Sequence, residues 1–263
     1  MKMNKYEFKN VTEESADLYI YGSIEAEKTP NIWTGEISEL DVDLKDFKAA
    51  LEGVKGTLNI YINSGGGSVF AADAMTAMLQ RAKDRGVKVH AYIDGLCASA
   101  ATFIAMVADE INVYRNSIMM IHKPIGAVYG NAAEMRKMIN TLDVIEESML
   151  NLYEHKAKVD RDRIKSMVDR ETWLDADGIA ENFTVNRIDG EKKVAACADL
   201  SACGYKIPAE FAAKIAAMGT GDKTPATANE TPQNGSDGAQ KGIMHDYSVI
   251  ENIIKNIEKE KNK

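Results

Sequence analysis

The chain has 263 residues, a length that fits one globular domain with an appendage or two small domains, and its 45% hydrophobic and 27% charged residues exclude wholesale disorder and a fibrous repeat. The formal net charge of −8 disfavours a general nucleic-acid binder, which needs a basic face to neutralise phosphates. No apolar run approaches the ~18 residues of a membrane span and the three cysteines form no metal-type pair, so we expect a cytoplasmic protein without nucleic-acid or membrane partners.

Units of strand, turn and helix follow one another from the first predicted strand onward. A strand is predicted over Asp17–Gly22, and a helix is expected near Leu44–Leu51. The β-rich run Leu58–Ser64 then meets the glycine turn Gly65–Ser68, after which helical spacing returns over Val69–Lys83.

The unit then repeats. A strand is predicted over Val87–Ile93, a turn over Asp94–Cys97 and a small-residue helix over Ala98–Ala108. Two more short strands follow, Glu110–Arg115 and Ser117–His122. The alternation of strands and helices indicates an α/β protein.

One long helix is predicted over Asn131–Lys158, with Asn131 as N-cap and Glu134 placed to complete a capping box. At about 28 residues and roughly 42 Å it would outreach a domain of this size, so we expect it to project and pack against a partner. The remaining predictions are two short helices, a strand and a last short helix: Asp160–Asp169, Ala176–Asn182, Thr184–Ile188 and Ala209–Met218.

The C-terminal part changes composition. Residues 219–242 are rich in Gly, Pro, Thr and Asn without apolar periodicity, which predicts a flexible linker. Within 243–263 an isoleucine stripe at helical spacing predicts an amphipathic helix that docks on another surface: Ile250, Ile253, Ile254 and Ile257.

Two helix starts, at Gly66–Ser68 and Ala98–Ser99, are expected at the ends of neighbouring strands. Helix starts gather backbone N–H donors, which suit a developing oxyanion. Alternatively, a glycine triplet after a strand can form no more than a tight turn, and Ser99 can serve only as the N-cap of a helix. The sequence pattern leaves both interpretations open.

Elimination among the four histidines gives one candidate general base. His90 alternates with apolar residues in a strand, His155 lies on the long helix, and His245 lies in the tail. His122 ends an apolar strand, at the kind of position where active-site residues gather, and is the best candidate.

Three segments, in order, resemble the ClpP family of serine proteases. YINSGGGSVFAADAM is similar to that family's strand–turn–helix, GLCASAATFIA to its nucleophile segment and MMIHKP to its histidine segment. The resemblance extends from about Asp17 to Ile188. Within it, WTGEISE, GNAAEM and ETWLDADGIAENF resemble the ClpP-related head-maturation (prohead) proteases of tailed phages more than housekeeping ClpP.

The resemblance implies that Ser99 is the nucleophile and His122 the general base. It also implies oxyanion donors in the backbone N–H groups of Gly67, with Gly66 as an alternative, and of Ala100. A serine needs such an adjacent base, and imidazole titrates near neutrality. Peptide hydrolysis by this set needs no metal or organic cofactor.

Two acidic residues are candidates for the third member of the triad. Glu171 stands where the family has its catalytic Asp, and Asp169 lies two residues earlier. Glu can orient an imidazole as Asp does, so we favour Glu171 and keep Asp169 as the alternative. Gly65 replaces the family's usual Pro and Ala100 its usual Met, which affects the expected fit of the substrate more than the chemistry.

The resemblance implies an α/β fold of the ClpP/crotonase type, with stacked β-β-α repeats and a projecting long handle helix. We expect five parts: an N-terminal segment, a protease domain, a short C-terminal helix region, a linker and an amphipathic helix, at 1–14, 15–205, 206–218, 219–242 and 243–263. The implied partners are copies of the chain in a ring, expected to be a heptamer able to stack in pairs, a capsid-related polypeptide substrate and an AAA+ unfoldase.

Four alternatives remain. A housekeeping-type Clp proteolytic subunit would use the same residues on other substrates. A crotonase-type acyl-CoA enzyme would need a Glu or Asp base near the amides and would give Ser99 and His122 no reason to occur together. A signal-peptide-peptidase relative would pair serine with lysine, and a scaffold or shell subunit would keep the fold without chemistry.

Overall fold

A parallel β-sheet forms the centre of the protein. The computed structural model describes residues 8, 9, 12, 14–28, 41–190 and 207–218. Its parallel strands lie in the order β2-β5-β6-β7-β10, and β1 runs antiparallel at the edge beside β2. Their bounds are Phe8–Lys9 (β1), Ser15–Ile20 (β2), Thr57–Ser64 (β5), Lys88–Ala98 (β6), Glu110–Tyr114 (β7) and Asn186–Ile188 (β10).

Strand β6 corrects one prediction. The expected turn at Asp94–Cys97 is strand, because on one side of β6 the partner β7 is exchanged for β8 (Ile118–Ile121) and β6 does not end. Strand β6 pairs with β7 up to Ile93 and with β8 from Leu96 to Ala98. On its other side it pairs with β5 up to Ile93 and again at Cys97, after a register shift. Asp94, at the exchange, is fully buried and accepts a hydrogen bond from the hydroxyl of Tyr21.

Helices cover both faces of the sheet. On one face α1 (Leu44–Leu51), α2 (Val69–Asp84) and α3 (Ala101–Val107) share the main core with the strands. On the other face, Phe211 and Ile215 of α7 (Ala209–Met218) pack in a second, smaller core. Its strand residues alternate along β6 and β8 with those that face the main core. Burying one such Ile or Leu side chain contributes about 1.5–3 kcal/mol, so the two cores fix the sheet from both sides.

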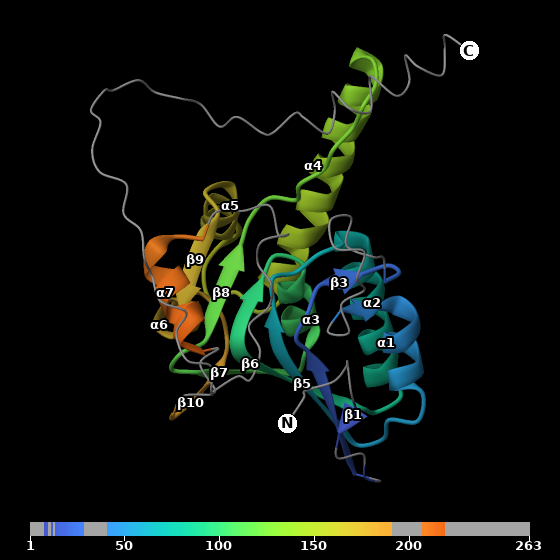
Figure 1. Cartoon of the computed structure of the whole chain (residues 1–263), viewed down its shortest axis with the longest axis vertical. Coiled ribbons are helices and arrows are strands. Elements are labelled where there is room, and N and C mark those ends of the chain that lie inside the picture. The colour runs from blue at the N-terminus through green and yellow to red at the C-terminus, as the bar shows by residue number, and fades with distance from the viewer. Residues whose placement is uncertain (1–7, 10–11, 13, 29–40, 191–206, 219–263) are drawn as a thin grey trace, which may run out of the picture. The chain divides into compact units, whose positions relative to one another are not determined.

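The long helix α4 (Ala132–Glu154) projects beyond the sheet (Figure 1). Asn131 caps it in the predicted capping box with Glu134. The helix ends four residues earlier than expected, because Lys158 donates its backbone N–H to Asn182 and Ala157 forms a bridge with Phe183. Large apolar side chains along its free part are exposed: Met135, Ile139 and Val144.

Two helices and a strand complete the region beside α4. The helices α5 (Arg161–Asp169) and α6 (Ala176–Asn182) lie where the sequence predicts them, and between them the unpredicted strand β9 (Thr172–Asp175) pairs antiparallel with β8. These elements confirm the α/β fold with its strand–strand–helix repeats and projecting helix.

A small second sheet supports the glycine turn. Strand β3 (Ile24–Glu25) pairs with β4 (Val42–Asp43), and Ile24 also forms a parallel bridge with Gly67. The predicted linker and terminal helix lie outside the described residues, and the division into five parts stays a prediction. No helix in the described part of the chain is long and apolar enough to cross a membrane.

Candidate active site

Ser99 occupies a sharp turn between β6 and α3. Its φ of +53° lies in the left-handed region, which costs a residue other than glycine of the order of 1–3 kcal/mol. The backbone N–H of Ser99 donates a hydrogen bond to the carbonyl of Met120 at 2.9 Å. The carbonyl of Ser99 accepts a hydrogen bond from the Thr102 hydroxyl at 2.6 Å. Ala100, and not Ser99, is the N-cap of α3, so the Ser99 hydroxyl is not used as a helix cap.

His122 follows β8 and meets this hydroxyl. Its Nε2 lies 2.7 Å from Ser99 Oγ, and its side chain is buried. Burial lowers the pKa of His122, and the nearby Glu171 carboxylate counteracts that effect in part. A neutral imidazole at hydrogen-bond distance from a hydroxyl can accept its proton.

Sheet register brings Glu171 to the same place. Strands β8 and β9 are antiparallel with Ile121 opposite Thr172, so His122 and Glu171 are the next pair along. Glu171 has a left-handed φ of +50°, and its Oε1 accepts a hydrogen bond of 3.2 Å from the Trp173 indole. Its carboxylate thus lies beside the imidazole ring that it would have to orient.

Asp169 faces a different set of groups. Its carboxylate forms ion pairs with Lys123 at 2.8 Å and Lys165 at 3.1 Å, and both lysines also bind Glu146 on α4. Among the described residues no contact between Asp169 and His122 is found. The hydrogen bond with Asp169 also raises the pKa of Lys123, which disfavours Lys123 as the neutral base of a serine–lysine site.

The two helix starts lie side by side, as the strand order requires. A Cβ built on Gly66 would lie 2.7 Å from the Ala98 carbonyl oxygen and 2.9 Å from the Ala100 nitrogen. The Gly66 N–H donates to Ser64 Oγ at 3.1 Å, whereas within the described residues no acceptor is found for the N–H groups of Gly67 and Ala100. Those two amides are therefore available to an oxyanion near Ser99.

These groups open into a cleft of about 340 Å³. Its lining is mostly small and apolar, and it comes from β3, the glycine turn and the ends of β6 and β8. The lining residues are Ser23, Glu25, Gly65, Gly66, Gly67, Ser68, Val69, Ser99, His122, Pro124 and Ile125.

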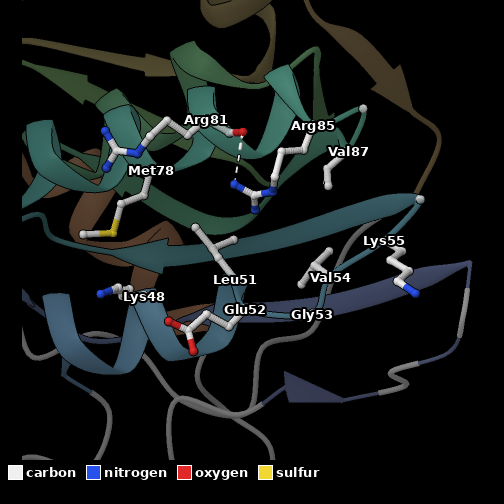
Figure 2. A pocket seen from close by; sticks show the side chains of 12 residues that line it. Lys48, Leu51, Glu52, Gly53, Val54, Lys55, Met78, Arg81, Arg85 and Val87 are labelled. Carbon is white, nitrogen blue, oxygen red and sulfur yellow. Dashed lines mark hydrogen bonds between the residues drawn. The ribbon is translucent and has the colours of Figure 1, made fainter.

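A larger groove, of about 700 Å³, lies between α1 and α2 (Figure 2). Lys48, Arg81 and Arg85 line it together with Leu51 and Met78, and none of the predicted site residues does so. No group of three or more His, Cys, Asp or Glu that could hold a metal ion occurs in the described part of the chain.

Sequence reasoning missed two features of the site. The strand β9, which sets the register of Glu171, is too short to show a period in the sequence. The placement of Glu25 in the cleft depends on the bridge between Ile24 and Gly67, two positions far apart in the chain.

Comparisons with known proteins point to one family. The family described as Clp protease matches residues 49–188, more than half of the chain. The chain is 28% identical over 167 residues to the ATP-dependent Clp protease proteolytic subunit 2 of Treponema denticola, which covers 62% of this chain and 82% of that protein. It is 26% identical over 137 residues to proteolytic subunit 1 of Prochlorococcus marinus, or 51% of this chain and 69% of the relative. A solved ClpP1 mutant from Listeria monocytogenes shares the fold with a TM-score of 0.53 at 24% identity, over 66% of this chain and 91% of that one.

Proposed function

The chain belongs to the Clp protease family, and from this premise we propose that it is a serine endopeptidase with Ser99 as nucleophile. One observation carries the proposal: a serine held in a strained turn lies 2.7 Å from the Nε2 of a buried histidine. Strain that the surrounding hydrogen bonds maintain is typical of functional sites. The fold alone would not support a catalytic role, because one fold serves many functions.

In the proposed reaction, Ser99 Oγ attacks the carbonyl carbon of the scissile peptide bond while His122 Nε2 takes the hydroxyl proton. The tetrahedral intermediate then collapses, the C–N bond breaks, and His122 gives the proton to the leaving amine. Water repeats the sequence on the acyl-enzyme, which releases the second product and restores the Ser99 hydroxyl. Glu171 orients the imidazole and stabilises its transient positive charge.

The oxyanion of each intermediate accepts hydrogen bonds from the N–H groups of Gly67 and Ala100. In the parallel bridge, Ile24 bonds to the carbonyl of Gly66 and the N–H of Ser68, so the Gly67 N–H points away from β3. One such donor is worth about 10²–10³ in kcat. The same edge of the glycine turn can pair with an extended substrate by strand addition.

We also propose that the chain assembles into a homo-oligomeric ring through α4. The helix leaves 48% of Met135, 57% of Ile139 and 70% of Val144 exposed, and Met135 and Ile139, four residues apart, share one face of it. Neighbouring exposed apolar side chains of this kind on a projecting helix favour an interaction surface. A ring with the serines inside would admit only extended polypeptide segments.

Two cytoplasmic roles compete for this peptidase. The relatives carry the name of ATP-dependent Clp proteolytic subunits, which favours work with an AAA+ unfoldase. The segments WTGEISE and ETWLDADGIAENF favour maturation of phage capsid or scaffold proteins. Cleavage of a folded protein only with a Clp ATPase and ATP supports the first role, and ATP-independent cleavage of the capsid or scaffold protein supports the second.

Labelling with an alkyl fluorophosphonate tests the chemistry. Ser99 should be the modified residue in a peptide digest, and Ser99→Ala and His122→Ala should both lose labelling and peptidase activity, because triad members act as a unit. Each variant should keep the subunit number of the wild type. Unchanged turnover in Ser99→Ala would exclude Ser99 as the nucleophile, and a wild-type protein that is neither labelled nor active would leave a scaffold subunit as the alternative.

A further inference from the structure

Glu25 is fixed at the wall of the cleft by main-chain hydrogen bonds. The backbone N–H of Ile24 donates to the Gly66 carbonyl at 2.8 Å, and its carbonyl accepts from the Ser68 N–H at 2.7 Å. Successive side chains of a strand point to opposite faces. Because Ile24 is fully buried in the core, the side chain of Glu25 turns the other way and lines the cleft with Ser99 and His122.

Glu25 is the one acidic residue among the described residues that line the cleft, and none of them is Lys or Arg. The other lining residues are glycines, serines and apolar residues, together with His122, whose pKa is lowered by burial. Burial, and then the nearby Asp41, raise the pKa of the Glu25 carboxyl. The carboxylate is therefore partly removed from water beside a like charge, which disfavours it energetically.

No cation among the described residues forms an ion pair with Glu25. Lys28, the next lysine along the chain, places its Nζ 2.7 Å from Asp46 at the start of α1. Asp41 accepts a hydrogen bond from the Ser23 N–H at 3.0 Å, so it is held beside β3. The wall of the cleft therefore presents negative charge that these neighbours do not neutralise.

We propose that Glu25 is a specificity-determining residue that binds a Lys or Arg side chain of the peptide substrate. This inference rests on the proposed function and names its substrate class: polypeptides with a basic residue near the scissile bond. A cation at this position forms a charge-assisted hydrogen bond with the carboxylate. A neutral side chain leaves the carboxylate without a partner, and an acidic one adds repulsion.

A set of internally quenched decapeptides tests the proposal. The peptides share one sequence with one cleavage site and differ at a single position, where Lys, Gln or Glu is placed in turn. The varied positions are the three residues on either side of the cleavage site. At one of these positions the wild type should show a kcat/KM about tenfold higher for Lys than for Gln, the worth of one charge-assisted hydrogen bond. Glu25→Gln should reduce that ratio to about one, and Glu25→Lys should reverse it in favour of the Glu peptide.

Glu27→Gln is the matched control, because it removes the same charge two residues away at an exposed position outside the cleft lining. It should keep the wild-type preference. The inference is overturned if no position favours Lys, if no peptide of the set is bound or cleaved, or if Glu25→Gln and Glu27→Gln behave alike. Labelling of Ser99 by an alkyl fluorophosphonate, which has no peptide part, separates this failure from a failure of the proposed function: labelling that persists without a basic preference rejects only the role of Glu25.

Discussion

Replacing Gly66 with alanine should disrupt the Ser99 turn from outside the catalytic groups. Gly66 has a φ of +96°, and an added Cβ would lie 2.7 Å from the Ala98 carbonyl oxygen, 2.9 Å from the Ala100 nitrogen and 2.9 Å from Ser99 Cβ. Two of these three atoms belong to the backbone, so no flexible side chain can move aside. The turn itself must shift.

The expected magnitude has two parts. The left-handed conformation costs an alanine about 1–2 kcal/mol, and overpacking against the backbone adds about 1–3 kcal/mol. A sum near 3 kcal/mol corresponds to a fall in Tm of roughly 6–12 °C for a domain of this size. A displacement of the nucleophile approaching 1 Å should also lower the rate of Ser99 labelling by about 10²-fold.

Gly53→Ala isolates the effect of the contacts. Gly53 has nearly the same φ, +98°, but a Cβ there would have nothing within 4 Å. This variant should lose only the conformational part, about 1–2 kcal/mol, and should label at the wild-type rate. Thermal unfolding at one fixed protein concentration and the rate of fluorophosphonate labelling measure both effects. If Gly66→Ala matches Gly53→Ala in both, the close packing of the two helix starts does not maintain the nucleophile turn.

Three further predictions address the triad, the turn and the tail. Glu171→Gln should lower kcat by at least tenfold. It should also move the acidic limb of the pH profile of kcat/KM to lower pH, because burial lowers the pKa of His122 and the Glu171 carboxylate counteracts that effect. An acidic limb that stays in place would mean that the two groups are not coupled. Thr102→Val should lower the free energy of unfolding by about 1–3 kcal/mol, as measured by urea titration. The substitution removes the donor to the Ser99 carbonyl and leaves the buried hydroxyl of Tyr153 without its Thr102 partner. Unchanged stability and labelling would show that the hydrogen bond to the Ser99 carbonyl does not support the turn. Truncation after Met218 should leave the number of subunits and the labelling of Ser99 unchanged. Size-exclusion chromatography with light scattering measures the first, and fluorophosphonate labelling measures the second. Loss of assembly or of labelling would place the tail within the folded domain.

The sequence by itself determined the repeating units and the main chemical candidates. A β-rich run, the glycine turn and helical spacing predicted β5 and α2, and Asn131 with Glu134 predicted the start of α4. These signals are local, because a strand, a turn or a cap depends on residues within a few positions of one another. His122 was singled out because it ends an apolar strand, and Ser99 because its segment resembles the nucleophile segment of the ClpP family.

Tertiary structure decided what the local signals could not. The strand β6 continues through Asp94–Cys97 because β8 replaces β7 as its partner on one side, and that exchange is not encoded in the segment itself. The register of β9 on β8 brings Glu171 next to His122, whereas Asp169, the last residue of α5, forms an ion pair with Lys123. Glu25 enters the cleft only through the bridge between Ile24 and Gly67. Each of these placements depends on pairing between strands distant in the chain, and such pairing is fixed by the packing of the whole sheet rather than by neighbouring residues.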